Sequence, residues 1–97
     1  MSNEKHHEAL RGHFAQYRGP VYDTLSEIFV PLGFTTDKIG ILDVAKLAVA
    51  MGYSPGALYV RIREQTLTPR SARALNALHR EITGREIDKE KLTRHFM

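Results

Sequence analysis

Long polar side chains that can hydrogen-bond to a charged ligand are concentrated near the middle of the chain, within residues 54–63. They are Tyr59, Arg61 and Arg63. An arginine can donate two parallel hydrogen bonds to a phosphate or to a guanine edge, and a tyrosine hydroxyl can donate one. These residue types therefore indicate contacts with a nucleic-acid backbone or with base edges.

Small residues occupy the start of the same stretch, at Ser54, Gly56 and Ala57. Ser54 followed by Pro55 is a strong helix-start signal, because serine caps free N–H groups and proline suits the first helical position. Small side chains would let this end of the helix approach a duplex closely. Its free N–H groups and positive dipole end would then face a phosphate.

A second helix precedes this one with little chain between them. Asp43 is a good N-cap for a helix that we expect to end at Met51, and Gly52 suits the left-handed turn that follows. The next helix is expected to run from Ser54 to Gln65. Two helices joined this closely are typical of the helix-turn-helix, whose second helix lies in the DNA major groove.

Basic residues are concentrated in the second half of the chain. Residues 1–52 hold 5 Lys/Arg and 6 Asp/Glu, whereas residues 53–97 hold 9 and 5, a net charge of +4. Thr66, Arg70 and Arg73 follow the expected DNA-facing helix, and we expect them to contact DNA, the arginines through phosphates. The alternative is an ordinary solvated helix face, which we favour for Arg80.

The stretch Leu-Ala-Val-Ala-Met-Gly-Tyr-Ser at 47–54 resembles the L-A-x-x-L-G-V-S motif of Cro/cI-type repressors. The polar turn before Pro69 is similar to the G-x-x-x-P loop of that family. The tail at 82–92 resembles the ending of the small YdaS-type phage repressors. The resemblance covers residues 43–95 and implies a dimeric, sequence-specific DNA-binding regulator, with Ser54, Gly56 and Tyr59 at positions that commonly face bases.

The chain departs from the family pattern at several places. Arg61 stands where the family buries an aliphatic residue, and the apolar residue is Ile62 instead. This leaves open whether Tyr59 or Val60 faces the bases. The loop glycine is missing, with Glu64 and Gln65 near its place, and about eight extra residues precede Asp43.

The remaining apolar periodicity predicts an all-α fold, a small bundle of five to six helices in one domain spanning 1–97. We expect an N-terminal helical extension of about residues 1–34, with one helix from Glu4 to Tyr17 and another that starts at Pro20. Within residues 34–42, we expect a turn or cap at 35–37 and either a loop or a short strand at 38–42, and we favour the loop. Later helices are expected at 69–83, with Ala72, Leu75, Leu78 and Ile82 in its apolar stripe, and after Asp88. The apolar face at 21–29 either closes the core or forms a dimer surface.

Several classes of protein are disfavoured by composition. The 97 residues include no cysteine, which excludes disulfides and thiolate catalysis. No apolar run approaches the roughly 20 residues of a membrane span, so we expect no membrane association and a cytoplasmic location. His6, His7 and His13 fit no metal-ligand spacing. We expect no metal, no cofactor and no enzymatic activity, because no nucleophile and base pattern is readable.

These observations predict a transcriptional regulator, most simply a repressor from a phage or plasmid, that binds double-stranded DNA as a homodimer. A second hypothesis is a protein-interaction adaptor or antirepressor built on the same scaffold. A third is non-specific nucleic-acid or RNA binding through the basic half alone.

Overall fold

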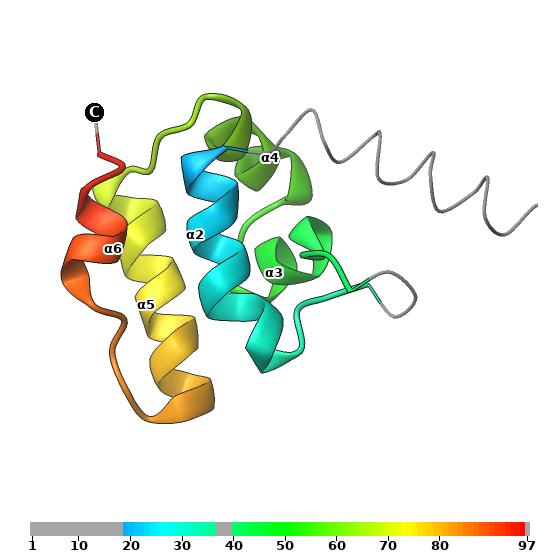
Figure 1. Ribbon diagram of the computed structural model, residues 1–97, viewed down its shortest axis with the longest axis vertical. Coiled ribbons are helices and arrows are strands. Elements are labelled where there is room, and N and C mark those ends of the chain that lie inside the picture. Colours follow the sequence, from blue (N-terminus) through cyan, green and yellow to red (C-terminus); the bar gives the residue numbers. More distant parts are fainter. Residues whose placement is uncertain (1–18, 37–39, 97) are drawn as a thin grey trace, which may run out of the picture.

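The computed structural model describes residues 19–36 and 40–96, and this part of the chain is all-α, as the sequence predicts (Figure 1). Its elements are α2 (Pro20–Phe29), the 3-10 helix η1 (Val30–Leu32), α3 (Val44–Ala50), α4 (Pro55–Arg63), α5 (Pro69–Thr83) and α6 (Lys89–Thr93). The helix expected from Glu4 to Tyr17 lies outside the described residues. Within the described ranges, extended pairing is limited to two isolated bridges, Thr35 with Leu42 and Leu67 with Phe96.

The helices are arranged around α2, which lies between the α3–α4 pair and the α5–α6 pair (Figure 1). Helix α6 runs back along α5 in the opposite direction. Each helix contributes apolar side chains to one core. Fully buried members of that core are Val21, Leu25, Phe29, Leu47, Leu58, Ile62, Leu67 and Leu75.

The apolar face of α2 closes this core. Val21, Leu25 and Phe29 have no exposed surface, and Tyr22 is also buried. Of the two roles considered for this face, the structure therefore assigns it to the interior of one molecule. Burial of each such side chain contributes about 1.5–3 kcal/mol to the free energy of folding. The apolar face of α2 therefore stabilises the packing of the two helix pairs.

Local capping explains where the helices begin. The side chains of Asp43, Ser54 and Thr68 each accept a hydrogen bond from a backbone N–H in the first turn that follows. Thr68 and Ser71 form a reciprocal capping box at the start of α5. Asp88 caps α6 in the same way, through Glu90 N at 3.2 Å. Each of these starts matches the start predicted from the sequence.

Residues on either side of 37–39 form a narrow antiparallel connection. Thr36 N donates to Ile41 O (2.9 Å), and Asp43 N donates to Phe34 O (3.0 Å). Phe34 packs its ring edge-on against Phe29, with centroids 5.8 Å apart. This connection forms one isolated bridge rather than a strand. Leu42 and Val44, which follow it, are buried in the core.

Two details of the predicted helices are wrong. Helix α4 ends at Arg63 rather than Gln65, because Gln65 has a left-handed backbone with φ of 57°. Ile82 does not join the buried stripe of α5; it is 46% exposed, because it lies in the last turn, beyond the buried part of the stripe. Among the described helices, none is both long enough and apolar enough to cross a membrane.

Candidate nucleic-acid interface

Helices α3 and α4 pack against each other across a short turn. Gly52 has φ of +83°, and the turn is closed by hydrogen bonds from Gly52 N to Val49 O (3.1 Å) and from Tyr53 N to Ala48 O (2.8 Å). These two bonds form a Schellman motif, which satisfies the last carbonyls of α3. Ala48 is fully buried, as expected for the small residue where two helices approach closely.

The first turn of α4 is open to solvent. Ser54, Gly56 and Ala57 are all exposed, as is Pro55. The Ser54 hydroxyl accepts a hydrogen bond from Ala57 N at 3.3 Å and so fixes the start of the helix. A Cβ placed on Gly56 would meet no atom within 4 Å, so another molecule has room to approach the backbone here.

One face of α4 packs into the core, and the opposite face points away from it. Leu58 and Ile62 are fully buried. At 100° per residue, Val60 lies on the opposite side of the helix, with Gly56 and Arg63 beside it. Gly56, Ala57 and Arg63 are exposed, and Val60 is half-buried.

Tyr59, which the family resemblance assigns to a base-facing position, lies beside the buried face of α4. It is half-buried and packs against the core, on the flank of α4. Val60, rather than Tyr59, is therefore directly opposite the Leu58–Ile62 face. This orientation of α4 follows because Ile62, rather than residue 61, is the buried residue one turn after Leu58.

Arg61 is half-buried and contributes to the end of α4. Its Nη1 donates to Thr66 Oγ1 at 3.4 Å, and its carbonyl accepts from Thr66 N at 3.2 Å. Arg61 and Thr66, both expected at a DNA surface, thus lie together, and their hydrogen bonds stabilise the loop that leads from α4 to α5.

Gln65 is a structural residue that the sequence reasoning did not identify. It stands at the position after the α4 cap with φ of 57°, where Gly52 stands after α3. Hydrogen bonds from Gln65 N to Ile62 O (3.1 Å) and from Thr66 N to Arg61 O complete a second Schellman motif. The Gln65 side chain accepts from Val21 N at 3.4 Å, and its amide lies against Gly19. The missing family glycine was the only signal of this residue.

Three exposed arginines lie on α4 and in the first part of α5. Arg63, Arg70 and Arg73 are exposed, and within the described ranges none of them has an acidic ion-pair partner. Arg73 also lines a groove between α5 and α6. By contrast, Arg80 lies 3.7 Å from Glu86 in an exposed ion pair.

No group of three His, Asp or Glu side chains that could hold a metal ion is found in the described part of the chain. The sequence matches no protein-family model, and neither a curated protein nor a solved structure matches the chain. A functional assignment accordingly depends on the geometry of α3, α4 and their neighbours.

Proposed function

We propose that the protein is a sequence-specific double-stranded DNA-binding regulator that inserts α4 into the major groove. In this proposal α3 and α4 act as a helix-turn-helix, with α3 supporting α4 from behind. The observation that carries it is the first turn of α4, which is exposed, built of small residues and rigidly capped, while Leu58 and Ile62 anchor the other side.

The side chains available on α4 determine how bases would be read. Ala57 and Val60 carry methyl groups and no hydrogen-bonding atoms, so they suit the C5-methyl groups of thymine. Arg63, one turn after Val60, suits the O6 and N7 acceptors of guanine. Gly56 would let the helix backbone approach the groove. A half-site combining thymines with one guanine is the expected target.

Phosphate contacts would come from residues beside α4. Arg70 stands in the first turn of α5, exposed and without an ion-pair partner among the described residues. The Ser54 hydroxyl, whose oxygen already accepts from Ala57 N, can still donate to a phosphate. A homodimer would repeat these contacts on a second half-site roughly 34 Å away, which is one turn of the duplex.

Selection of bound duplexes from a random library tests the proposal. The full chain should enrich one sequence, and a palindrome would indicate a dimer. Arg63→Ala should lose about tenfold or more in affinity for that sequence, equivalent to about 1–3 kcal/mol for a bidentate guanine contact. Arg85→Ala is the matched control, because Arg85 is exposed and lies in the loop between α5 and α6. Enrichment of no sequence would contradict the proposal.

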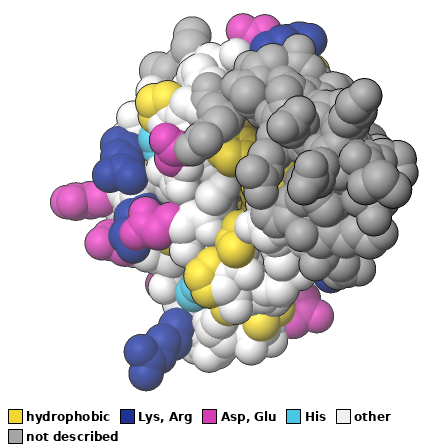
Figure 2. Space-filling model, turned by 45° about the vertical axis from the view of Figure 1, so that its right-hand side comes forward, with side chains coloured by type: hydrophobic (Ala, Val, Ile, Leu, Met, Phe, Trp, Pro, Cys, Tyr) yellow, Lys and Arg dark blue, Asp and Glu magenta, His cyan; other side chains and the backbone are white. Residues whose placement is uncertain are grey.

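Two alternatives make different predictions in a gel-shift series. A non-specific nucleic-acid binder would show steep salt dependence without a preferred sequence. On the described part of the face drawn in Figure 2, basic side chains are interspersed with acidic ones. A protein-interaction adaptor would bind no duplex even at low salt, and the nonpolar first turn of α4 is the observation that favours it.

A further inference from the structure

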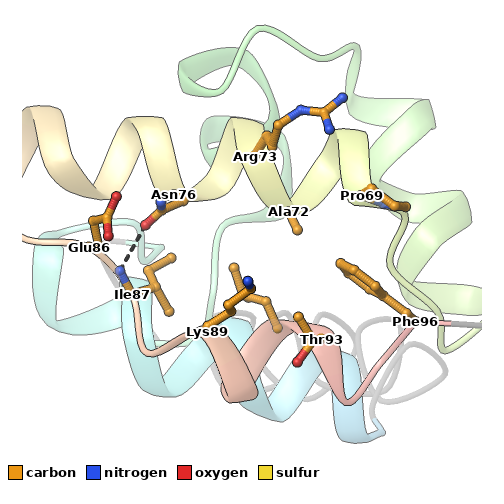
Figure 3. A pocket seen from close by; sticks show the side chains of 10 residues that line it. Pro69, Ala72, Arg73, Asn76, Glu86, Ile87, Lys89, Thr93 and Phe96 are labelled. Atoms are coloured by element: carbon orange, nitrogen blue, oxygen red, sulfur yellow. Dashed lines mark hydrogen bonds between the residues drawn. The ribbon is translucent and has the colours of Figure 1, made fainter.

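An apolar groove of about 380 Å³ lies between α5 and α6 (Figure 3). Its floor contains the buried residues Ala72, Ile87 and Leu92. Phe96 and Pro69 stand at one end of the groove, and Asn76 with Ile87 at the other. The groove is hollow beside α5 because the Ala72 side chain ends at Cβ.

The walls of the groove are fixed by hydrogen bonds at both ends. Asn76 Oδ1 accepts from Ile87 N at 2.8 Å, which holds the chain before α6 against the middle of α5. At the other end, Leu67 N donates to His95 O at 2.9 Å. The groove is thus already formed, and an occupant would not have to separate the two helices.

Two cationic residues line the groove, one on each helix. Arg73 lies on α5, with its guanidinium turned away from the groove in Figure 3, and Lys89 lies on α6. Neither has an acidic ion-pair partner among the described residues. Glu86 is the one acidic residue in the lining, and its carboxylate lies 3.7 Å from Arg80 Nη1. The apolar floor is therefore flanked by two cations without partners.

This combination selects the kind of molecule that would fit. A second copy presenting the same groove would bring Arg73 and Lys89 against their own counterparts, which is electrostatically unfavourable. A small ligand is normally enclosed over most of its surface, whereas this groove is open along the two helices. An open groove between helices matches the binding mode in which an amphipathic helix inserts its apolar residues.

We propose that the α5–α6 groove docks an acidic amphipathic segment of a partner protein. A bulky apolar side chain of the segment sits over Ala72, between Ile87 and Phe96. Carboxylates on either side of it pair with Arg73 and Lys89. This site is separate from α4 and does not depend on the proposed DNA binding.

The test uses the full chain and a fluorescein-labelled helical peptide of about 14 residues, roughly four turns. Leucines at i, i+3, i+4 and i+7 form its apolar face, and glutamates flank them. A second peptide replaces each glutamate with lysine, and a third replaces each leucine with serine. We expect the first peptide to bind at least about tenfold more tightly than the other two. In amide NMR spectra it should shift Ala72, Asn76 and Ile87.

Variants of the chain separate the apolar and charged parts of the site. Ala72→Leu fills the groove, and Arg73→Glu with Lys89→Glu reverses the two charges. Each should weaken binding of the acidic peptide by about tenfold. Arg85→Glu, outside the lining, should leave it unchanged, and the double charge reversal covers the case in which Ala72→Leu unfolds the protein. The proposal is overturned if the acidic peptide does not bind, if the lysine peptide binds equally well, or if the shifts lie elsewhere.

Discussion

Thr24 and His95 are joined by a hydrogen bond of 2.8 Å between Thr24 Oγ1 and His95 Nε2, across 71 positions of sequence. Both side chains are buried. Arg94 Nη2 also donates to Thr24 Oγ1, at 3.2 Å. The hydroxyl can accept from Arg94 and at the same time donate its proton to an unprotonated Nε2, which agrees with the lowered pKa of His95. This pair ties the end of α6 to α2 and favours neutral His95.

The first prediction concerns acid stability. Burial, followed by the positive charge of Arg94, lowers the pKa of His95 from its usual value of 6.5. The folded state therefore disfavours a proton that the unfolded chain accepts. Stability is complete above the unfolded pKa and is lost as the pH falls through 6.5 toward the lower folded pKa. The loss should not exceed about 1.4 kcal/mol per pH unit for this one group.

Urea unfolding at several pH values between about 5 and 8 measures this effect, since the denaturation midpoint should fall with pH. Asp23 and Glu27 of α2 line the same surface depression as Arg94 and His95. His95→Gln keeps a hydrogen-bonding side chain but cannot titrate. If this variant shows the same pH slope as the parent, the slope does not come from His95.

A second prediction concerns Gln65, whose positive φ ends α4 and whose side chain accepts from Val21 N. Gln65→Ala keeps the unfavourable backbone conformation and loses the hydrogen bond, so the free energy of unfolding should fall by about 1 kcal/mol. Gln65→Gly loses the same bond but removes backbone strain of about 1–2 kcal/mol. The glycine variant should therefore be at least as stable as the parent. Thermal unfolding of all three decides, and an alanine variant as stable as the glycine variant would contradict this account.

The helix starts could be predicted because capping is local. Asp43, Ser54, Thr68 and Asp88 each cap the helix that follows, and each signal is complete within a few residues. The core face of α4 is also predictable from local sequence, because Leu58 and Ile62 are four residues apart and so lie on one face of a helix. Local spacing thus gave the all-α class and the order of the helices 43–51, 54–65 and 69–83 to within two residues.

Features made by distant residues could not be predicted. The partner of the Gln65 side chain lies 44 positions away, and that of His95 lies 71 away. Glutamine itself does not favour the left-handed region, so the sequence predicts an end of α4 that is two residues too late. Burial of Tyr59 on the flank of α4 depends on the same tertiary packing. The α5–α6 groove likewise arises from the way Ala72 faces Ile87 and Leu92.

The third prediction separates phosphate contacts from base contacts. If Arg70 contacts a phosphate, Arg70→Ala should weaken binding to the selected duplex and to random duplex by a similar factor. The slope of log affinity against log salt should fall in magnitude by about one unit. Titration at a series of salt concentrations measures both quantities. Arg85→Ala is again the control, and a loss confined to the selected duplex would instead assign Arg70 to base reading.

The last prediction concerns the methyl groups on the outer face of α4. Uracil lacks the C5-methyl group of thymine but keeps the O4 acceptor, so exchanging thymine for uracil removes only the apolar contact. At each thymine touched by Ala57 or Val60, the exchange should weaken binding by about fourfold, the equivalent of about 0.8 kcal/mol for one buried methyl group. The same exchange outside the half-site should have no effect.

A double-mutant cycle with Val60→Ala assigns the contact to a single side chain. The variant has lost the two valine methyl groups, so it should bind the thymine and uracil duplexes almost equally at the position that Val60 reads. Because Val60 is half-buried rather than in the core, the variant should remain folded, which circular dichroism checks. Equal binding of the parent chain to both duplexes, with sequence preference retained, would place base reading on other residues, with Arg63 as the first to test.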